Sequence, residues 1–204
     1  MKYKLVIWDI DGTLLDTSIG LLDAYKYTIK FLKLPEKSDQ EILSYIGPTP
    51  QNIFKKYFNM NDKDAQIATD IFREHYKTHD LFKASVYDGI YDIMESLKKN
   101  KVKQAIATNK RQDYAIDICK HFNFDKYCFP IYGSDNFNKT TKAESILKCL
   151  KTLNITNLSC AIMIGDTEQD QIAAKTAGID FLGINYGFGF KNCVYVKTVK
   201  TKGN

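Results

Sequence analysis

Tyr3-Lys4-Leu5-Val6-Ile7-Trp8-Asp9-Ile10-Asp11-Gly12-Thr13, near the start of this 204-residue chain, combines an apolar run with two closely spaced carboxylates. Residues 5–8 form a continuous apolar run, too short for a helix and rich in strand formers, which predicts a strand buried on both faces of a parallel sheet. Asp9 and Asp11 follow it, and side chains two residues apart on an extended chain point the same way. A divalent cation between them would make this pairing of like charges favourable, and Gly12 permits a tight turn. An acidic turn without function is the alternative for this stretch alone, because Asp-Gly is a common turn dipeptide.

The composition indicates one large domain, or one domain that carries an insertion. A hydrophobic fraction of 44%, with 13% aromatic residues, supports a full core. The net charge is +5, but the only arginines are Arg73 and Arg111, and no basic cluster interleaves with aromatic residues. This pattern speaks against a nucleic-acid partner and favours a lysine-rich, solvated surface. Mild basicity also attracts anionic substrates.

The cysteines and histidines predict neither a disulfide framework nor a zinc site. The five cysteines are scattered, odd in number and without CxxC spacing, so we expect reduced thiols. His75 and His79 are four residues apart but lack an HExxH motif, so an exposed helix face is the simpler interpretation. Charge interrupts the first eight residues too early for a signal peptide, and no later apolar run is long enough to span a membrane. We therefore expect a soluble, cytoplasmic protein without a membrane partner.

After Thr13 the sequence shows helical periodicity as far as Leu81, and we find no convincing strand between Asp16 and Phe82. The first helical segment ends at Pro35, and its apolar stripe consists of Leu21, Leu22, Tyr25, Ile29 and Leu32. Further helices are predicted over residues 40–46, 52–58 and 62–81. For the last of these we expect an apolar side made of Ile67, Ile71 and Phe72.

From Ser85 onward, helical and strand patterns alternate. Apolar runs typical of buried strands are residues 102–107, 129–132, 160–164 and 181–184. Helical patterns pass through residues 93–97 and 116–122 and cover residues 143–153 and 172–177. Alternating units of this kind predict an α/β fold, a Rossmann-like parallel sheet with helices on both faces. The lysine-rich tail from Lys191 is expected to contain at most one strand, residues 194–196, and then to fray.

The all-helical block is then an insertion after the first strand. We predict a core domain of residues 1–15 and 84–204, with a helical cap domain of residues 16–83. Ligands of open parallel sheets bind beyond the carboxyl ends of the strands, so the residues after each apolar run are the candidates for function.

Thr108 and Asn109 follow the run at residues 102–107. A hydroxyl and the backbone N–H groups that open a helix suit a phosphate oxygen. The alternative is that one of these two residues is merely a helix N-cap.

Lys142 lies inside a capping-box pattern, Thr141-Lys142-Ala143-Glu144. The pattern places this lysine at the first helical position, where the helix dipole disfavours a cation. A nearby anion would offset that cost, although lysine is abundant enough for chance placement to compete.

Asp166 follows the apolar run that ends at Ile164, so a third carboxylate reaches the same rim of the sheet. Thr167 and Asp170 fit a second capping box, which accounts for Asp170 but not for Asp166. Carboxylates, a hydroxyl and a lysine at strand tips and first helical turns together predict a hard-oxygen site for Mg²⁺ and a phosphate.

On these motifs the sequence resembles the haloacid dehalogenase superfamily, in its phosphoglycolate phosphatase-like branch with a helical cap. Asp9-Ile10-Asp11-Gly12-Thr13 matches DxDGT, and residues 165–170 match GDxxxD. Thr108 and Lys142 match the second and third motifs, and the helical block matches the cap that follows the first motif. The resemblance covers about residues 4–196. The chain departs from relatives at its C-terminus, where a further helix is usual.

The resemblance implies a Mg²⁺-dependent phosphatase acting on a small phosphorylated metabolite such as phosphoglycolate. Asp9 would be the nucleophile that forms an aspartyl-phosphate, and Asp11 the general acid and base. The metal would be held by Asp9, the backbone carbonyl of Asp11, and Asp166. Asp170 would support the site and pair with Lys142. The phosphoryl oxygens would be held by Thr108, the Asn109 N–H and Lys142.

The cap would close through hinges near residues 14–18 and 82–86 and exclude water. The loop 47–50, with Gly47 and Thr49, and the flanking Tyr45, Gln51 and Asn52 are candidates for contacting the leaving group; an ordinary helix-helix turn is the alternative. Lys110 and Arg111 would meet an acidic substrate or be solvated.

Several alternatives share this scaffold. A β-phosphoglucomutase-like phosphomutase would keep every residue named, and pyrophosphatase or nucleotidase activity also occurs among capped relatives. Hydrolytic dehalogenases lack the Mg²⁺ set, so Asp11 and Asp166 argue against that reaction. A non-catalytic binding module would have lost the nucleophile or a metal ligand, and none is missing here. We expect a monomer or a homodimer.

Overall fold

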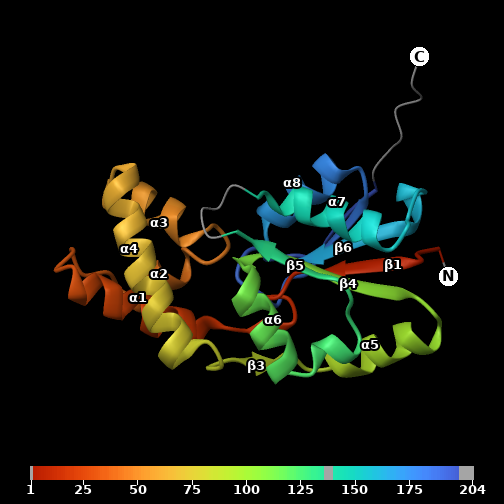
Figure 1. Ribbon diagram of the computed structural model, residues 1–204, viewed down its shortest axis with the longest axis horizontal. Helices are drawn as coiled ribbons and strands as arrows, with labels where there is room; N and C mark the ends of the chain where they lie inside the picture. The colour runs from red at the N-terminus through yellow and green to blue at the C-terminus, as the bar shows by residue number, and fades with distance from the viewer. Residues whose placement is uncertain (1, 136–139, 198–204) are drawn as a thin grey trace, which may run out of the picture.

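The computed structural model describes residues 2–135 and 140–197, and the fold below refers to them (Figure 1). Their main sheet has six strands in the order β5-β4-β1-β6-β7-β8, in which the first five are parallel and β8 is antiparallel. The strands are β1 (Leu5–Trp8), β4 (Lys103–Arg111), β5 (Ile131–Ser134), β6 (Ala161–Gly165), β7 (Asp180–Gly183) and β8 (Val194–Val196). The predicted parallel α/β sheet is confirmed. The end of the tail, which we expected to fray, lies outside the described residues, which stop at residue 197.

Strand β1 lies in the centre of the sheet and is buried on both faces, as its apolar run predicted. Leu5 and Ile7 pack into one hydrophobic cluster, and Val6 and Trp8 pack into the other. This alternation follows from the two-residue period of a strand. The core is therefore two layers, one on each side of β1.

Helices cover both faces of the sheet (Figure 1). On one face lie α7 (Lys142–Thr152) and α8 (Glu168–Ala177), which share a cluster with Leu5 and Ile7. On the other lie α5 (Ile90–Lys99) and α6 (Gln112–His121). No helix in the described part of the chain is both long enough and apolar enough to cross a membrane.

A block of helices projects beyond one end of the sheet, on the left of Figure 1. It contains α1 (Ser18–Phe31), α2 (Asp39–Leu43), α3 (Pro50–Phe58) and α4 (Asp62–His75), and a π-helical turn, Tyr76–Asp80, continues α4. We call residues 17–84 the helical block. The structure describes all of these residues, and none of them belongs to a strand, as expected.

The helical block is joined to the sheet through a two-stranded antiparallel ribbon that the sequence analysis did not predict. Strand β2 (Leu15–Asp16) pairs with β3 (Ser85–Val86), with Leu15 opposite Val86 and Asp16 opposite Ser85. The chain therefore enters and leaves the helical block side by side, close to the boundaries predicted for the inserted segment.

Two local predictions were wrong. Strand β4 does not end at residue 107 but continues to Arg111, which is the N-cap of α6, so neither Thr108 nor Asn109 opens a helix.

Ile67, predicted on the apolar side of its helix, is 47% exposed, and the buried face of α4 is offset from it. Small side chains form much of that buried face, namely Ala65, Ala68 and Thr69 together with Phe72 and Arg73.

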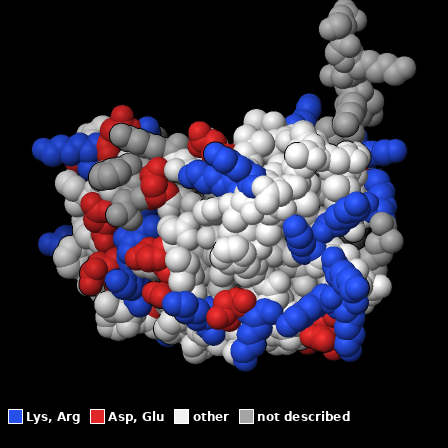
Figure 2. Space-filling view, turned by 45° about the vertical axis from the view of Figure 1, so that its right-hand side comes forward, with Lys and Arg blue, Asp and Glu red and all other residues white. Residues whose placement is uncertain are grey.

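Lysines on the face shown in Figure 2 lie mainly toward its margins, around a broad centre without charged side chains. Acidic residues are interspersed among them mainly on the left of the view. The positive charge of this face is therefore spread out.

Candidate active site

The register of the sheet brings the predicted motifs to one rim. Trp8 of β1 is opposite Ile106 of β4 and Ile164 of β6. Thr108 and Asp166 each follow those partners by two residues, so both stand at the strand tips that flank Asp9. Convergence at the carboxyl ends of the strands follows from parallel pairing.

Asp9 and Asp11 each contact a different lysine. Asp9, only 6% exposed, has Oδ1 3.0 Å from Lys142 Nζ. Asp11 Oδ1 lies 3.1 Å from Lys110 Nζ. Both pairs are within ion-pair distance, but neither oxygen makes a hydrogen bond of normal geometry to any described residue. Each carboxylate therefore has a buried oxygen without a hydrogen-bond partner among the described residues.

Three buried carboxylates form a cluster. One oxygen each of Asp9, Asp166 and Asp170 lies within 4.8 Å of the other two. Lys142 Nζ is 2.5 Å from Asp170 Oδ1 and is the cation of the cluster. With Asp11 and Lys110 counted, the rim carries four carboxylates and two ammonium groups, which leaves an excess of negative charge when all are ionised.

This crowding shifts the proton affinities of the carboxylates. Burial raises the pKa of Asp9 to about 7, against the opposing effect of the Lys142 charge and with the help of neighbouring carboxylates. Burial also raises the pKa of Asp166 to about 6, although the N–H of Phe188 works in the opposite direction. For Lys142, burial lowers the pKa, but Asp170 and Asp9 hold it above its ordinary value. The excess of anionic oxygen ligands fits a hard divalent cation such as Mg²⁺.

The two capping boxes that place Lys142 and Asp170 are present. Thr141 Oγ1 accepts from the Glu144 N–H at 3.2 Å, and the Glu144 carboxylate accepts from the Thr141 N–H at 2.7 Å. Lys142 is therefore the first residue of α7, with its side chain buried. The anions that offset its unfavourable place in the helix dipole are Asp9 and Asp170. Asp170 also accepts from the Thr167 N–H at 3.0 Å.

The segment after β7 holds Asp166, a role that the sequence analysis missed. The Phe188 N–H donates to Asp166 Oδ2 at 2.7 Å, and the Thr13 hydroxyl donates to Oδ1 at 3.3 Å. Gly12 has φ +75°, and a Cβ there would overlap the Asp166 carboxylate. Glycine is therefore required at position 12 both for its conformation and for the close approach. The glycine at position 12 could be recognised from the DxDGT pattern. No sequence motif indicated that the Phe188 N–H would bind Asp166.

Thr108 and Asn109 lie in the irregular last part of β4, where the pairing with β5 shifts between Ala107 and Arg111. Thr108 is buried, and its Oγ1 accepts from the Lys110 N–H at 3.2 Å. Asn109 Nδ2 donates to the Gly47 carbonyl at 3.3 Å, which connects the strand tip to the helical block. Both residues face the same pocket as Asp9.

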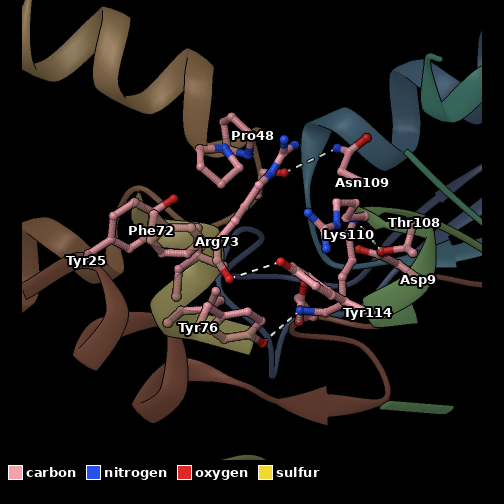
Figure 3. A pocket seen from close by; sticks show the side chains of 16 residues that line it. Asp9, Tyr25, Pro48, Phe72, Arg73, Tyr76, Thr108, Asn109, Lys110 and Tyr114 are labelled. Atoms are coloured by element: carbon pink, nitrogen blue, oxygen red, sulfur yellow. Dashed lines mark hydrogen bonds and ion pairs between the residues drawn. The ribbon is translucent and has the colours of Figure 1, made fainter. Parts of the chain in front are cut away.

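A pocket lies between the strand tips and the helical block (Figure 3). It contains about 670 Å³ of space not filled by protein atoms, including its opening to solvent. Its lining is partly aromatic and partly charged: Asp9, Asp11, Leu21, Tyr25, Ile46, Gly47, Pro48, Pro50, Phe72, Arg73, Tyr76, Thr108, Asn109, Lys110, Arg111 and Tyr114.

Only some of the residues predicted to contact the leaving group line the pocket. Gly47 lines the pocket, with Pro48 and Pro50, but Thr49 is not among the described lining residues. Tyr45 is buried and its ring stacks on Tyr57 at 4.0 Å, so it belongs to the core. Asn52 is exposed on α3, and Gln51 does not line the pocket either. Of the predicted loop and its flanking residues, Gly47, Pro48 and Pro50 line the pocket, and contact with a leaving group stays a prediction.

Lys110 is not solvated, which was one of the two sequence-based alternatives; it lines the pocket, and its contact with an acidic substrate stays a prediction. It is buried, pairs with Asp11 and donates to Tyr76 Oη at 2.9 Å. Tyr76 belongs to the π-helical turn of the helical block, whereas Asp11 follows β1. Lys110 therefore connects the helical block with a carboxylate of the site.

Comparisons with known proteins agree with this geometry. A family model described as haloacid dehalogenase-like hydrolase matches residues 6–184. A Pseudomonas aeruginosa protein named 5'-nucleotidase is 30% identical over 190 residues, 93% of this chain and 86% of that protein. An Aquifex aeolicus phosphoglycolate phosphatase is 30% identical over 177 residues, 86% of this chain and 81% of that protein. The crystal structure of a predicted phosphatase from Clostridium acetobutylicum matches with a TM-score of 0.87 and 33% identity, covering 92% of this chain and 87% of that one.

Proposed function

The chain belongs to the haloacid dehalogenase-like hydrolases, and on that premise we propose that it is a Mg²⁺-dependent phosphatase of small phosphomonoesters. The observation that carries this proposal is the convergence of Asp9, Asp166, Asp170 and Lys142 at the strand tips, next to a pocket. Buried carboxylates in excess of cations have no structural benefit by themselves, but they suit a metal and a phosphoryl group.

Asp9 is the proposed nucleophile. Its carboxylate attacks phosphorus in line with the leaving oxygen, so that an Asp9 O–P bond forms as the ester P–O bond breaks. Asp11 gives its proton to the leaving oxygen. A water molecule then attacks the aspartyl-phosphate and loses its proton to Asp11, which releases phosphate and restores both carboxyl groups.

The remaining residues at the rim bind and orient. Thr108 Oγ1, the Asn109 N–H and the Lys142 ammonium group are proposed to hold the phosphoryl oxygens. Asp9, the backbone carbonyl of Asp11, and Asp166 would hold Mg²⁺, which supplies positive charge to the phosphoryl oxygens when bound. Asp170 keeps Lys142 charged and in place.

We propose that residues 16–83 act as a cap domain on a core of residues 1–15 and 84–204. Three hydrogen bonds between described residues already join these parts at the pocket: Asn109 to the Gly47 carbonyl, Lys110 to Tyr76, and Tyr114 to the Arg73 carbonyl. The β2–β3 ribbon stands where the hinges are expected, so movement there would open and close the pocket over the phosphoryl site.

A nucleoside monophosphate is the second candidate substrate class. Four aromatic residues line the pocket, Tyr25, Phe72, Tyr76 and Tyr114, and aromatic rings suit a nucleobase. A similar protein of P. aeruginosa is named 5'-nucleotidase. Phosphomutase and pyrophosphatase reactions would use the same rim residues; turnover that depends on a bisphosphate primer would identify a phosphomutase.

The test is to assay wild-type protein, Asp9→Asn and Asp117→Asn with phosphoglycolate, sugar phosphates, nucleotides and pyrophosphate, with Mg²⁺ and with EDTA. Asp117 is exposed on α6, so its substitution is the matched control. We expect Asp9→Asn to abolish phosphate release while the circular dichroism spectrum is retained, and EDTA to abolish it reversibly. Turnover by Asp9→Asn would refute the nucleophile, and turnover in EDTA would refute the metal.

A further inference from the structure

The two arginines of the chain both line the pocket, although lysine is the usual basic residue elsewhere in the sequence. Arg73 extends from the inner face of α4 and is 6% exposed. Burying a guanidinium group costs hydration free energy, so arginine is seldom found this deep in a protein. A buried arginine in the wall of a pocket is therefore a candidate contact for an anionic ligand.

Arg111 has a structural partner on its own strand end. Its guanidinium group donates to both oxygens of Asp113, at 2.6 and 2.5 Å, and lies 4.0 Å from the centre of the Tyr114 ring. Asp113 thus compensates much of the Arg111 charge. Arg111 therefore lines the pocket, but we do not propose it as the residue that binds an anionic ligand.

Arg73 belongs to α4 of the helical block, whereas Arg111 ends β4 of the sheet. Its carbonyl accepts from Tyr114 Oη at 3.0 Å, which fixes the backbone against α6. Its side chain extends along the pocket in the direction of Pro48 (Figure 3). Burial and then the charge of Arg111 lower the pKa of Arg73. Tyr114, Asp70 and Asp113 act in the opposite direction on this pKa.

Beside Arg73, part of the pocket wall consists of adjoining aromatic rings (Figure 3). Tyr25 and Phe72 have ring centres 4.4 Å apart, and Phe72 and Tyr76 have theirs 5.7 Å apart. Tyr76 in turn contacts Tyr114, at 6.1 Å. Such a wall packs against the carbon part of a ligand. A phosphomonoester with its phosphoryl group at Asp9 would direct its leaving group along this wall toward α4.

We propose that Arg73 binds a second anionic group, a carboxylate or a phosphate, carried on the leaving group of the substrate. A guanidinium group presents paired N–H donors that match either anion in a bidentate manner. Arg73 is then the residue that makes the enzyme prefer anionic leaving groups. The inference rests on the proposed function, because it places the scissile phosphoryl group at Asp9.

Two matched pairs of substrates test it. The first is 2-phosphoglycolate against 2-hydroxyethyl phosphate, which replaces the carboxylate by a hydroxymethyl group. The second is 1,3-propanediol bisphosphate against 1,3-propanediol monophosphate, which differ in a second phosphate group. The pair that shows the larger preference tells whether Arg73 binds a carboxylate or a phosphate. In the wild type, kcat/KM for the anionic member of one pair should exceed that for its neutral partner by about 10- to 100-fold.

Arg73→Gln should bring that ratio close to one, and Arg73→Lys should give an intermediate ratio because it keeps the charge but not the paired donors. Lys63→Gln is the matched control, since Lys63 is exposed on the same helix. A wild-type ratio near one for both pairs, or a ratio that Arg73→Gln leaves unchanged, would overturn the proposal. If Arg73→Gln does not fold, Arg73→Lys decides the question by the same ratio.

Binding measured by calorimetry separates this proposal from the proposed function. The Asp9→Asn variant, with Mg²⁺ present, is titrated with the members of both pairs. The double variant that carries Asp9→Asn and Arg73→Gln is then titrated with the same compounds. Tighter binding of an anionic member that Arg73→Gln removes supports the subsite even when no substrate is turned over. Equal binding within both pairs refutes the subsite while leaving the nucleophile assignment to its own assay.

Discussion

The backbone of Gly12 lies so close to the Asp166 carboxylate that a side chain at position 12 would occupy the same space. The DxDGT turn and the tip of β6 are therefore packed without a gap, and the nucleophile segment fixes the position of a proposed metal ligand.

We expect Gly12→Ala to displace Asp166 and weaken Mg²⁺ binding by at least about 10-fold, since ligand placement controls affinity. Gly89→Ala is the matched control, because Gly89 has φ +78° but no atom within 4 Å of the added Cβ. Both variants should lose about 1 kcal/mol of unfolding free energy from the positive φ, with an additional loss at position 12. Activity titrated with Mg²⁺ checks the first effect; equal behaviour of the two variants would contradict it.

Lys142→Ala removes the cation between Asp9 and Asp170. Leaving buried carboxylates uncompensated should cost about 3 kcal/mol of unfolding free energy at pH 8, and less near pH 5.5, where the carboxylates can protonate. Phosphatase activity should fall by at least about 100-fold. The control is Lys148→Ala, an exposed lysine of the same helix. Urea unfolding at both pH values measures the difference, and a loss independent of pH would argue against the carboxylate cluster as its cause.

Stability without metal should decrease as the pH rises through the range in which Asp166 and Asp9 ionise. Their folded-state pKa values, about 6 and about 7, lie above the ordinary value of 3.8. Between about pH 4 and pH 7 the folded protein therefore binds more protons than the unfolded chain, and each of these carboxyl groups reduces stability as the pH increases.

Mg²⁺ should reverse this trend, because protons compete with the metal for the same oxygens at low pH. The expected result is a larger rise of the melting temperature on adding Mg²⁺ at pH 8 than at pH 5.5. Thermal unfolding with EDTA and with Mg²⁺ at both pH values tests it. An equal rise at both would mean that the metal binds elsewhere.

Tyr76→Phe removes the hydrogen bond between the helical block and Lys110. We expect a loss of about 1 kcal/mol of unfolding free energy and a decrease in kcat, because the ammonium group beside Asp11 loses an anchor. Tyr27→Phe on α1 is the control, since Tyr27 is 40% exposed and lies outside the pocket lining. Steady-state kinetics and urea unfolding measure the two effects. A Tyr76→Phe enzyme as active and as stable as the control would show that the contact between Tyr76 and Lys110 does not support the site.

The positions of Asp9, Thr108 and Asp166 at one rim could be predicted because they depend on local signals. Each follows a short apolar run, and parallel pairing alone brings the ends of such runs together. The capping box likewise placed Lys142 at the start of its helix. These features need no knowledge of which helices contact which strands.

The contacts made by the helical block were not predictable in the same way. Nothing in the local sequence shows that Arg73 and Tyr76 reach the pocket, because their partners are far along the chain, in β4 and α6. Ile67 was misplaced since small residues, not large apolar ones, form much of the buried side of α4. The end of β4 was misjudged because a polar strand tip with irregular pairing resembles a helix start.

The paired crossing of the chain at Leu15–Asp16 and Ser85–Val86 makes the helical block, topologically, one long loop closed at its base. Whatever lies beyond that closure can change in length or sequence without shifting the register of β1 against β4 and β6. On the proposed function, an exchange of residues 17–84 that keeps Tyr76 should therefore change the substrate preference while Asp9, Thr108 and Asp166 stay at the strand tips.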